Sequence, residues 1–184
     1  MYVADASPTH VCLLNKFNVV DHHLLIVTRE FEEQRSLLTL RDFEAWWRCM
    51  GEYGSLGFYN GGVEAGASQS HKHLQLVPLP LAPQGPPVPI EPLLAGVRGA
   101  AASGTIPGFD FVHAFARLDA ARDERVAARE ACERYTELLR QVGLRPPSGR
   151  GAELQRGPYC LLATREWLLL VPRSREFFGS ISIN

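Results

Sequence analysis

The alternation of short apolar runs with turn residues predicts a chain that is built largely of strands. These runs lie at residues 9–14, 22–28, 54–59, 71–79, 107–118, 159–164 and 167–171. Apolar runs of this length, bounded by Gly, Pro or polar residues, are typical of β-strands. The last two runs are separated only by Arg165-Glu166, which predicts a hairpin.

Two segments show the longer period of a helix. In residues 40–53 the apolar side chains of Phe43, Trp46, Trp47 and Met50 recur at helical spacing, and Thr39 precedes them as a candidate N-cap. Residues 120–142 contain strong helix formers and end before a glycine. We therefore expect two helices, and we expect the apolar face of the first to be directed into the core.

The order of the elements predicts the fold class. Strands, a helix, more strands, a second helix and a hairpin are typical of an α+β fold in which helices cover one side of an antiparallel sheet. We expect one domain over residues 1–184, with a Pro-rich irregular segment at 80–108. The first predicted strand begins near residue 9 and an apolar alternation stops at Asn184, so we expect this domain to be incomplete at both ends.

Composition narrows the classes of partner. The chain has 184 residues, of which 46% are hydrophobic, and a formal net charge of -1. This charge gives no general attraction to nucleic acid, and the absence of a long apolar run excludes a membrane-spanning helix. The first residues do not have the pattern of a signal peptide, so we expect a cytoplasmic protein. The four cysteines form no C-x-x-C pair, so we expect no structural zinc.

The candidate chemistry lies in the run His71-Lys72-His73-Leu74-Gln75, which follows the Gly- and Ser-containing segment 60–70. Alternate residues of a strand share one face, so the two imidazoles and the amide would point the same way. A neutral imidazole is a good nucleophile near neutral pH, and a Gly-rich loop can offer N–H groups to phosphate oxygens. The pattern therefore predicts a histidine that attacks a phosphorus atom held by the adjacent loop.

We expect His73 to be the nucleophile, with His71 as its support and the Gln75 amide as a donor to a phosphate oxygen. The second ring nitrogen of His73 needs a fixed acceptor, and we expect a loop carbonyl near Gly62 or Val63. Metal ligation by the two histidines is the alternative, although the spacing nominates no third ligand. For the run Asp21-His22-His23 we expect a structural role or a place at the rim of the site.

Further polar residues are candidates for binding substrate. Ser68 and Gln69, with Gly66 and Ala67, could donate to a polyphosphate. Asn60 could hold a ribose or a phosphate, or simply form a turn. In the pair Asn15-Lys16, the lysine could bring a positive charge to a phosphate, or the pair could be a solvated turn.

Four stretches of the chain strongly resemble the diadenosine tetraphosphate (Ap4A) phosphorylases, or ATP adenylyltransferases, of the histidine-triad superfamily. The stretches are residues 13–20, 23–31, 58–60 and 66–75, and residues 171–174 are similar to the family's C-terminal motif. The resemblance implies a HIT-like antiparallel sheet with flanking helices. It also implies a two-step transfer: a histidine takes the adenylyl group and releases ATP, and phosphate then takes the adenylyl group to give ADP.

The resemblance also implies roles for individual residues. His73 matches the nucleophile, and Gln75 matches the amide that replaces the third histidine of hydrolytic relatives. The matches to nucleotide- and phosphate-binding positions are Asn15, Lys16, Asn60, Gly66, Ala67, Ser68, Gln69 and Asn184. The chain departs from the family pattern in having an alanine at 67 where serine is common, and in lacking segments before and after those present.

The implied ligands are small molecules: Ap4A, ATP, ADP and phosphate. No tightly bound cofactor is expected, although a divalent cation can accompany the phosphates. Two alternatives stay open at this point. One is a hydrolase that uses water in place of phosphate, and the other is a nucleotide-binding module without turnover. The oligomeric state is not predicted.

Overall fold

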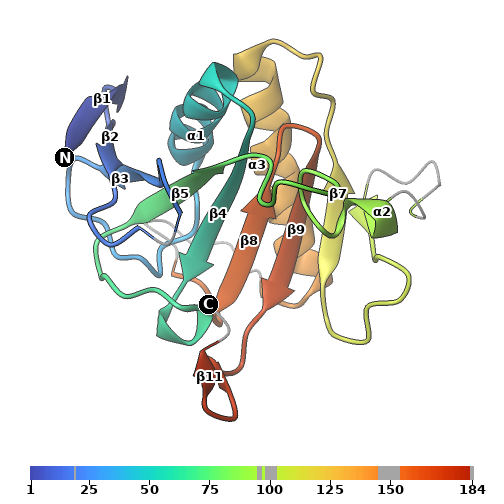
Figure 1. Ribbon diagram of the computed structural model, residues 1–184. Helices are drawn as coiled ribbons and strands as arrows, with labels where there is room; N and C mark the ends of the chain where they lie inside the picture. Colours follow the sequence, from blue (N-terminus) through green and yellow to red (C-terminus); the bar gives the residue numbers. More distant parts are fainter. Residues whose placement is uncertain (19, 95–96, 98–102, 145–153, 183–184) are drawn as a thin grey trace.

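The computed structural model describes residues 1–18, 20–94, 97, 103–144 and 154–182. In this part of the chain, nine strands form one antiparallel sheet in the order β1-β2-β3-β5-β4-β8-β9-β7-β6 (Figure 1). The strands are β1 Tyr2–Ser7, β2 His10–Leu14, β3 Leu24–Thr28, β4 Ser55–Gly61, β5 His73–Pro78, β6 Ser103–Gly104, β7 Ala114–Arg117, β8 Tyr159–Ala163 and β9 Trp167–Pro172. The predicted α+β class and antiparallel sheet are confirmed.

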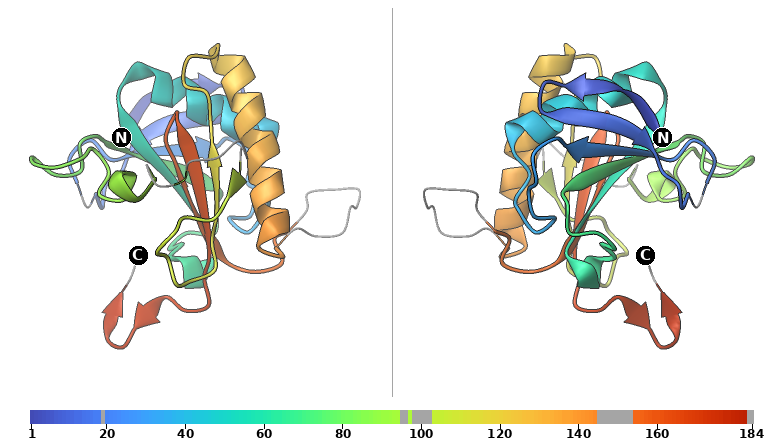
Figure 2. Two further views of the ribbon diagram at one scale, coloured as in Figure 1. Left: turned by 90° about the vertical axis from the view of Figure 1, so that its right-hand side faces the viewer. Right: turned by 90° about the vertical axis from the view of Figure 1, so that its left-hand side faces the viewer.

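Two long helices, α1 (Leu40–Glu52) and α3 (Glu124–Gln141), pack against each other on one face of the sheet (Figure 2). Thr39 caps α1 as predicted: its hydroxyl accepts from the Asp42 N–H, and the Asp42 carboxylate accepts from the Thr39 N–H, which is a capping box. The remaining elements are short. They are the 3₁₀ turn η1 (Val63–Ala65), the helix α2 (Glu91–Leu94), and a separate hairpin of β10 (Phe177–Phe178) and β11 (Ile181–Ser182).

The alternation of side chains along the strands gives the sheet two apolar faces. One face packs against α1 and α3. The core between this face and the helices includes the predicted core residues Phe43, Trp46, Trp47 and Met50 of α1, all of which are buried. The other face, around Val77 and Leu169, is covered in part by Val88, Leu94 and Ile106 of the Pro-rich segment. That segment is therefore not wholly irregular, because α2 and β6 lie within it.

Along β5 this alternation fixes the position of the candidate site. Leu74 and Leu76 are buried in the core under the helices, and Val77 lies in the core on the opposite face. His73 and Gln75 therefore belong to the face opposite the helices. The site is thus built on the side of the sheet that α1 and α3 leave uncovered.

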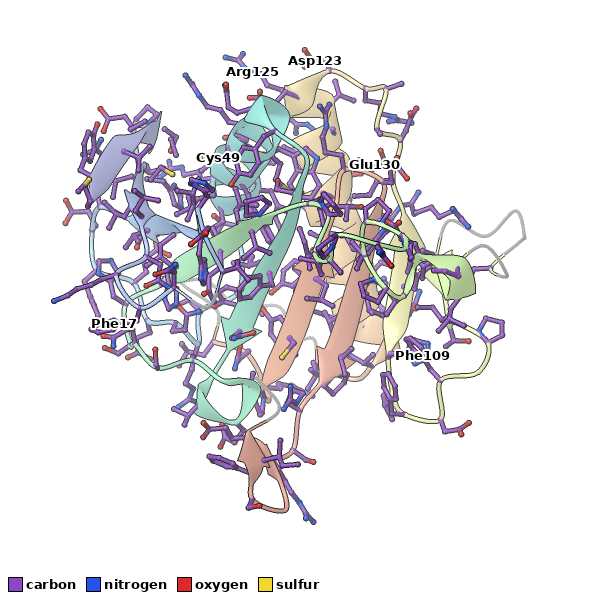
Figure 3. The ribbon with its side chains drawn as sticks, viewed as in Figure 1. Phe17, Cys49, Phe109, Asp123, Arg125 and Glu130 are labelled. Atoms are coloured by element: carbon purple, nitrogen blue, oxygen red, sulfur yellow. The ribbon has the colours of Figure 1, made fainter. Side chains whose placement is uncertain are left out.

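One strand was missed, and two predicted boundaries were wrong. Strand β1 was missed because its first four side chains are all exposed, which leaves no alternation to detect. The strand predicted at 107–118 is confined to β7, because Phe109 stacks on Phe111 and the His113 ring accepts the N–H of Ile106 within a loop. Helix α3 begins at Glu124 rather than 120, since Asp123 caps it by accepting from the Arg125 N–H (Figure 3).

Candidate active site

His73 is the first residue of β5, and its orientation is fixed by the residue two positions earlier. The His73 Nδ1 lies 2.8 Å from the backbone oxygen of His71 and donates to it. The lone pair of the neutral ring therefore belongs to Nε2. The predicted acceptor near Gly62 or Val63 was wrong, because the bend before β5 turns the nearer carbonyl toward the ring.

The environment of His73 favours the neutral imidazole. Its exposed fraction is 9%, and this burial lowers the pKa of His73 below its ordinary value. The hydrogen bond to the His71 carbonyl opposes the shift, and the nearby His71 ring adds to it. A neutral ring with a free Nε2 is the form that can act as a nucleophile.

The side chain of Gln34 holds the main chain of His73 in place. Its Oε1 accepts from the His73 N–H at 2.8 Å, and its Nε2 donates to the carbonyls of Asn60 at 2.9 Å and His73 at 3.2 Å. The regular pairing of β4 with β5 ends at Phe58 and Gln75, two residues short of this point. The buried Gln34 amide therefore substitutes for a rung of the ladder between Asn60 and His73.

A chain of hydrogen bonds leads from Gln75 to the turn between β2 and β3. The His23 Nε2 donates to Gln75 Oε1 at 3.0 Å, and the Asn15 Nδ2 lies 3.3 Å from His23 Nδ1. Burial lowers the pKa of His23, which favours the neutral ring that can donate at one nitrogen and accept at the other. Because its oxygen is occupied by His23, Gln75 keeps its amide N–H groups for a ligand. His23 thus orients a predicted site residue.

The His71 side chain turns away from His73. Its Nε2 lies 3.0 Å from the hydroxyl of Thr28, and its ring packs on Phe31 with centroids 5.4 Å apart. The contact of His71 with His73, the predicted nucleophile, is therefore made by its backbone carbonyl. The supporting role of His71 stays a prediction, and the structure shows that its ring contacts Thr28 and Phe31.

The loop before the histidines divides into a closed part and an open part. The N–H groups of Gly66 and Ala67 donate to Val63 and Gly62, respectively, within the turn. Gly66 has φ of 95°, in the left-handed region that favours glycine. Ser68 and Gln69 are exposed, and in the described ranges their N–H and side-chain groups make no hydrogen bond. Among the four predicted loop residues, those that offer donors to a ligand are therefore Ser68 and Gln69.

The remaining predicted residues are placed less directly. Lys16 is exposed in the turn after β2, with its ammonium 5.5 Å from the centroid of the Phe17 ring. Asn15 uses its Oδ1 to accept from the Phe17 N–H, so its amide nitrogen is the group directed at His23. Asn184 lies outside the described residues.

The sequence analysis missed the buried ionic cluster behind the histidines. The Lys72 side chain is fully buried and its Nζ donates to Asp42 at 2.8 Å, Glu32 at 3.0 Å and the Leu37 carbonyl at 3.0 Å. The Asp42 carboxylate also accepts from His10 at 3.0 Å. Burial would raise the pKa of Asp42, but His10 and Lys72 outweigh it and hold this pKa at about 2. A lysine between two histidines was a visible clue, but its partners are distant in sequence.

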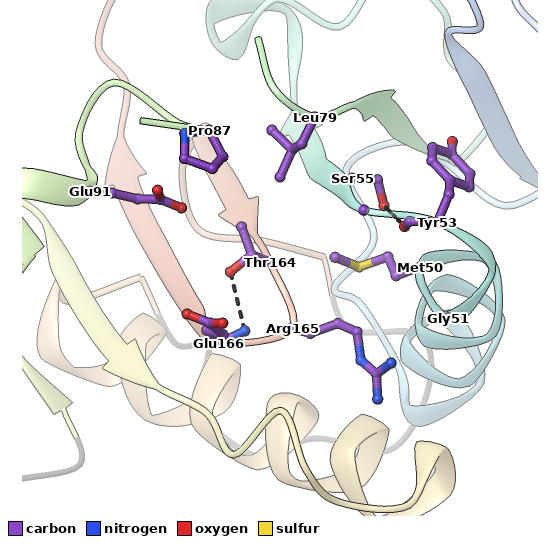
Figure 4. Close-up of a pocket in the computed structure, with 11 residues that line it drawn as sticks. Met50, Gly51, Tyr53, Ser55, Leu79, Pro87, Glu91, Thr164, Arg165 and Glu166 are labelled. Carbon is purple, nitrogen blue, oxygen red and sulfur yellow. Dashed lines mark hydrogen bonds between the residues drawn. The ribbon is translucent and has the colours of Figure 1, made fainter. Parts of the chain in front are cut away.

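Two cavities differ in their relation to His73. One of about 400 Å³ lies at the far end of β4 and β5, beside the end of α1 and the β8–β9 turn, and includes none of the predicted site residues (Figure 4). The other, of about 600 Å³, lies between residues 31–35 and the loop and is lined by Ala67, Ser68 and Gln69. The second cavity therefore borders the candidate site. In the described part of the chain, no group of three or more His, Cys, Asp or Glu is arranged to hold a metal ion.

These features agree with the comparisons to known protein families. Residues 1–96 match the Ap4A phosphorylase N-terminal domain, and residues 107–184 match the ATP adenylyltransferase C-terminal domain. The chain belongs to the Ap4A phosphorylase family. Its two matched segments share one sheet, since β4 of the first pairs with β8 of the second. Among the residues described, no helix has the length and apolar character needed to cross a membrane.

Individual relatives support this assignment. Diadenosine 5',5'''-P1,P4-tetraphosphate phosphorylase 2 of Saccharomyces cerevisiae is 30% identical over 190 residues, which cover 91% of this chain and 55% of the yeast protein. A crystal structure of yeast Ap4A phosphorylase in complex with Ap4A matches with a TM-score of 0.68 and 27% identity, over 97% of this chain and 62% of that chain. This family member thus spans little more than half the length of the yeast relative.

A more distant neighbour shares the fold alone. An ADP-glucose phosphorylase from Arabidopsis thaliana with bound ADP-glucose has a TM-score of 0.62 at 14% identity, over 93% of this chain and 74% of that chain. The same sheet therefore occurs in proteins with little sequence in common with this one.

Proposed function

We propose that this chain catalyses the phosphorolysis of Ap4A to ATP and ADP through an adenylyl–histidine intermediate. The observation that carries the proposal is the hydrogen bond from His73 Nδ1 to the His71 carbonyl, which leaves Nε2 unprotonated. Membership of the Ap4A phosphorylase family and the complex of the yeast relative with Ap4A support the choice of substrate. A cytoplasmic location is part of the same proposal.

In the first step, the Nε2 lone pair of His73 forms a bond to the α-phosphorus of Ap4A. The bond from that phosphorus to the bridging oxygen breaks, and its electron pair leaves with ATP. The ring gains positive charge, which the His71 carbonyl stabilises through the Nδ1 proton. The amide N–H groups of Gln75, oriented by His23, would donate to an oxygen of the phosphate under attack.

In the second step, an oxygen of inorganic phosphate attacks the adenylyl phosphorus. The phosphorus–nitrogen bond breaks, the electron pair returns to Nε2, and ADP leaves. Ser68 and Gln69 would hold phosphate oxygens during both steps, and Lys16 would supply a positive charge at the opposite side. Dividing the displacement in this way regenerates the neutral His73 ring.

Product analysis tests this proposal against its alternatives. With Ap4A and phosphate, we expect equal amounts of ATP and ADP, and without phosphate only one ATP per protein chain. Chromatography of the products measures both. The variant His22→Asn, changed at an exposed histidine outside the site, is the matched control and should behave as the wild type. Steady release of AMP without phosphate would identify a hydrolase, and binding of Ap4A without any product would identify a binding module.

The burial of His73 predicts a specific pH dependence. The attack needs the neutral ring, and a lowered pKa keeps the ring neutral at pH values where an ordinary histidine is half protonated. We expect kcat/KM for Ap4A to rise with pH and to reach half its plateau below pH 6.5, the ordinary pKa of histidine. Initial rates across a pH series measure this midpoint. A midpoint above the ordinary value would show that the ring is more exposed or more strongly paired with a negative charge than described.

A further inference from the structure

One peptide unit connects the proposed nucleophile to the segment that precedes α1. In the peptide between His71 and Lys72, the carbonyl accepts from the His73 Nδ1 at 2.8 Å. The N–H of the same peptide donates to the Glu32 carbonyl at 2.8 Å. A trans peptide is planar, and its C=O and N–H point in opposite directions. The bond to Glu32 therefore fixes the direction in which the His71 carbonyl meets the imidazole.

These two hydrogen bonds form a chain that ends at the ring of His73. The Glu32 carbonyl accepts from the peptide, and the peptide accepts from the ring. Hydrogen bonds that are linked through one peptide polarise each other, so the first bond makes the His71 carbonyl a stronger acceptor. A stronger acceptor at Nδ1 stabilises the positive charge that the ring gains during adenylyl transfer.

The side chain of Lys72 anchors this peptide from the other face of the sheet. Adjacent side chains of an extended segment point to opposite faces, so Lys72 projects toward the helices and His73 does not. The Lys72 Nζ donates to Glu32 at 3.0 Å, to Asp42 of α1 at 2.8 Å and to the Leu37 carbonyl at 3.0 Å. The ammonium is thus held by two acceptors in the segment before α1 and by one in α1 itself.

Lys72 and Glu32 are joined at two points, because both their main chains and their charged groups are hydrogen-bonded. On the side of β3, the Thr28 N–H donates to the Lys72 carbonyl at 3.3 Å. Residue 72 is therefore fixed at its N–H, its carbonyl and its ammonium. Stability alone does not require this arrangement, since apolar residues of similar volume in place of a whole buried ionic cluster are often equally stable.

We propose that Lys72 is a positioning residue for adenylyl transfer, because its buried ammonium keeps the His71 carbonyl on the Nδ1 of His73. Lys72 acts through the peptide alone, since its side chain is fully buried on the helix face of the sheet. This role rests on the proposed function, because the ring that is positioned is the one that takes the adenylyl group. Without the anchor the peptide can turn, and the ring attacks with poorer geometry and with its positive charge less well stabilised.

The first experiment separates positioning from stability. Lys72→Met removes the ammonium, and adding Asp42→Asn removes the negative charge that has lost its lysine partner. The double variant therefore recovers stability without recovering the anchor. We expect the single-turnover rate of adenylylation at saturating Ap4A to fall about ten-fold in both variants, and the half-saturating concentration of Ap4A to stay unchanged. Intact-mass time courses at a series of Ap4A concentrations give both values.

Leu138→Ala is the matched control, since it opens a cavity in the buried core at α3 and destabilises the fold without changing the ionic cluster. It should be adenylylated at the wild-type rate. If Lys72→Met does not fold, the double variant decides. A rate that recovers with stability in the double variant, no loss of rate in Lys72→Met, or an equal loss in Leu138→Ala would each overturn the positioning role.

A second measurement needs no turnover. Nitrogen NMR distinguishes a protonated from an unprotonated ring nitrogen, and comparison with His73→Ala assigns the signals of this ring. At a pH where the ring is neutral, we expect the proton on Nδ1 in the wild type and both tautomers in the two Lys72 variants. Loss of this preference in a protein whose wild type never becomes adenylylated would uphold the positioning role and refute the proposed reaction. Adenylylation of the wild type, with an unchanged tautomer in the variants, would uphold the reaction and overturn the positioning role.

Discussion

Replacing His73 with alanine should abolish formation of the adenylyl–enzyme when the protein is mixed with Ap4A. The variant lacks the imidazole whose Nδ1 donates to the His71 carbonyl, and it therefore lacks the proposed nucleophile. Loss of a covalent nucleophile reduces the rate by at least about a thousand-fold. Intact-mass measurement of the protein without added phosphate detects the adenylyl group directly.

The matched control is His71→Ala. Because the acceptor for His73 is the backbone oxygen of residue 71, this variant keeps the acceptor and loses the ring's contacts to Thr28, Glu30 and Phe31. We expect it to become adenylylated, more slowly than the wild type. Adenylylation of His73→Ala, or complete loss in His71→Ala with the fold intact, would mean that the two histidines have been assigned the wrong roles.

The largest expected effect on stability is that of Lys72→Met. Methionine fills much of the same volume but removes the ammonium group that pairs with Asp42, whose carboxylate is 2% exposed. Removing Lys72 leaves the buried Asp42 carboxylate with His10 and Thr39 as its remaining partners, and we expect the free energy of unfolding to fall by about 3–5 kcal/mol. Urea denaturation of the variant and wild type under the same conditions measures the difference.

Two further variants isolate the cause of this loss. Glu32→Gln alters the partner of Lys72 that is 43% exposed, and it should cost far less than Lys72→Met. Adding Asp42→Asn to Lys72→Met removes the negative charge that has lost its lysine partner and keeps an oxygen that can accept from His10, so the double variant should be more stable than Lys72→Met alone. Additive losses in the double variant would show that the two side chains contribute independently.

The parts of the fold that the sequence could predict are those set by local pattern. Helix α1, its cap at Thr39 and its buried face were predicted because capping and helical spacing involve residues within one or two turns. The β8–β9 hairpin was predicted for the same reason. By contrast, β1 is an exposed edge strand, and nothing in its own six residues distinguishes it from a loop.

The sequence predicted which residues belong to the candidate site, but it did not predict the hydrogen bonds that hold them in place. The motif predicted His73 and Gln75 as site residues, and their roles stay predictions. The groups that hold them, Gln34 and His23, are 39 and 52 residues away in the chain, respectively. For His23 the sequence indicated a structural role or a place at the rim of the site, and for Gln34 it gave no local indication of function. Contacts over such separations arise from the order of strands in the sheet, which the sequence pattern did not fix.

The amide of Gln34 has a consequence for how this protein could be observed in solution. Since its oxygen accepts the N–H of His73, that proton can exchange with deuterium only when the glutamine releases it. The exchange rate of this single backbone N–H therefore reports when residues 31–36 separate from His73. Hydrogen exchange at this one backbone N–H would therefore detect movement of residues 31–36 without a probe attached to them.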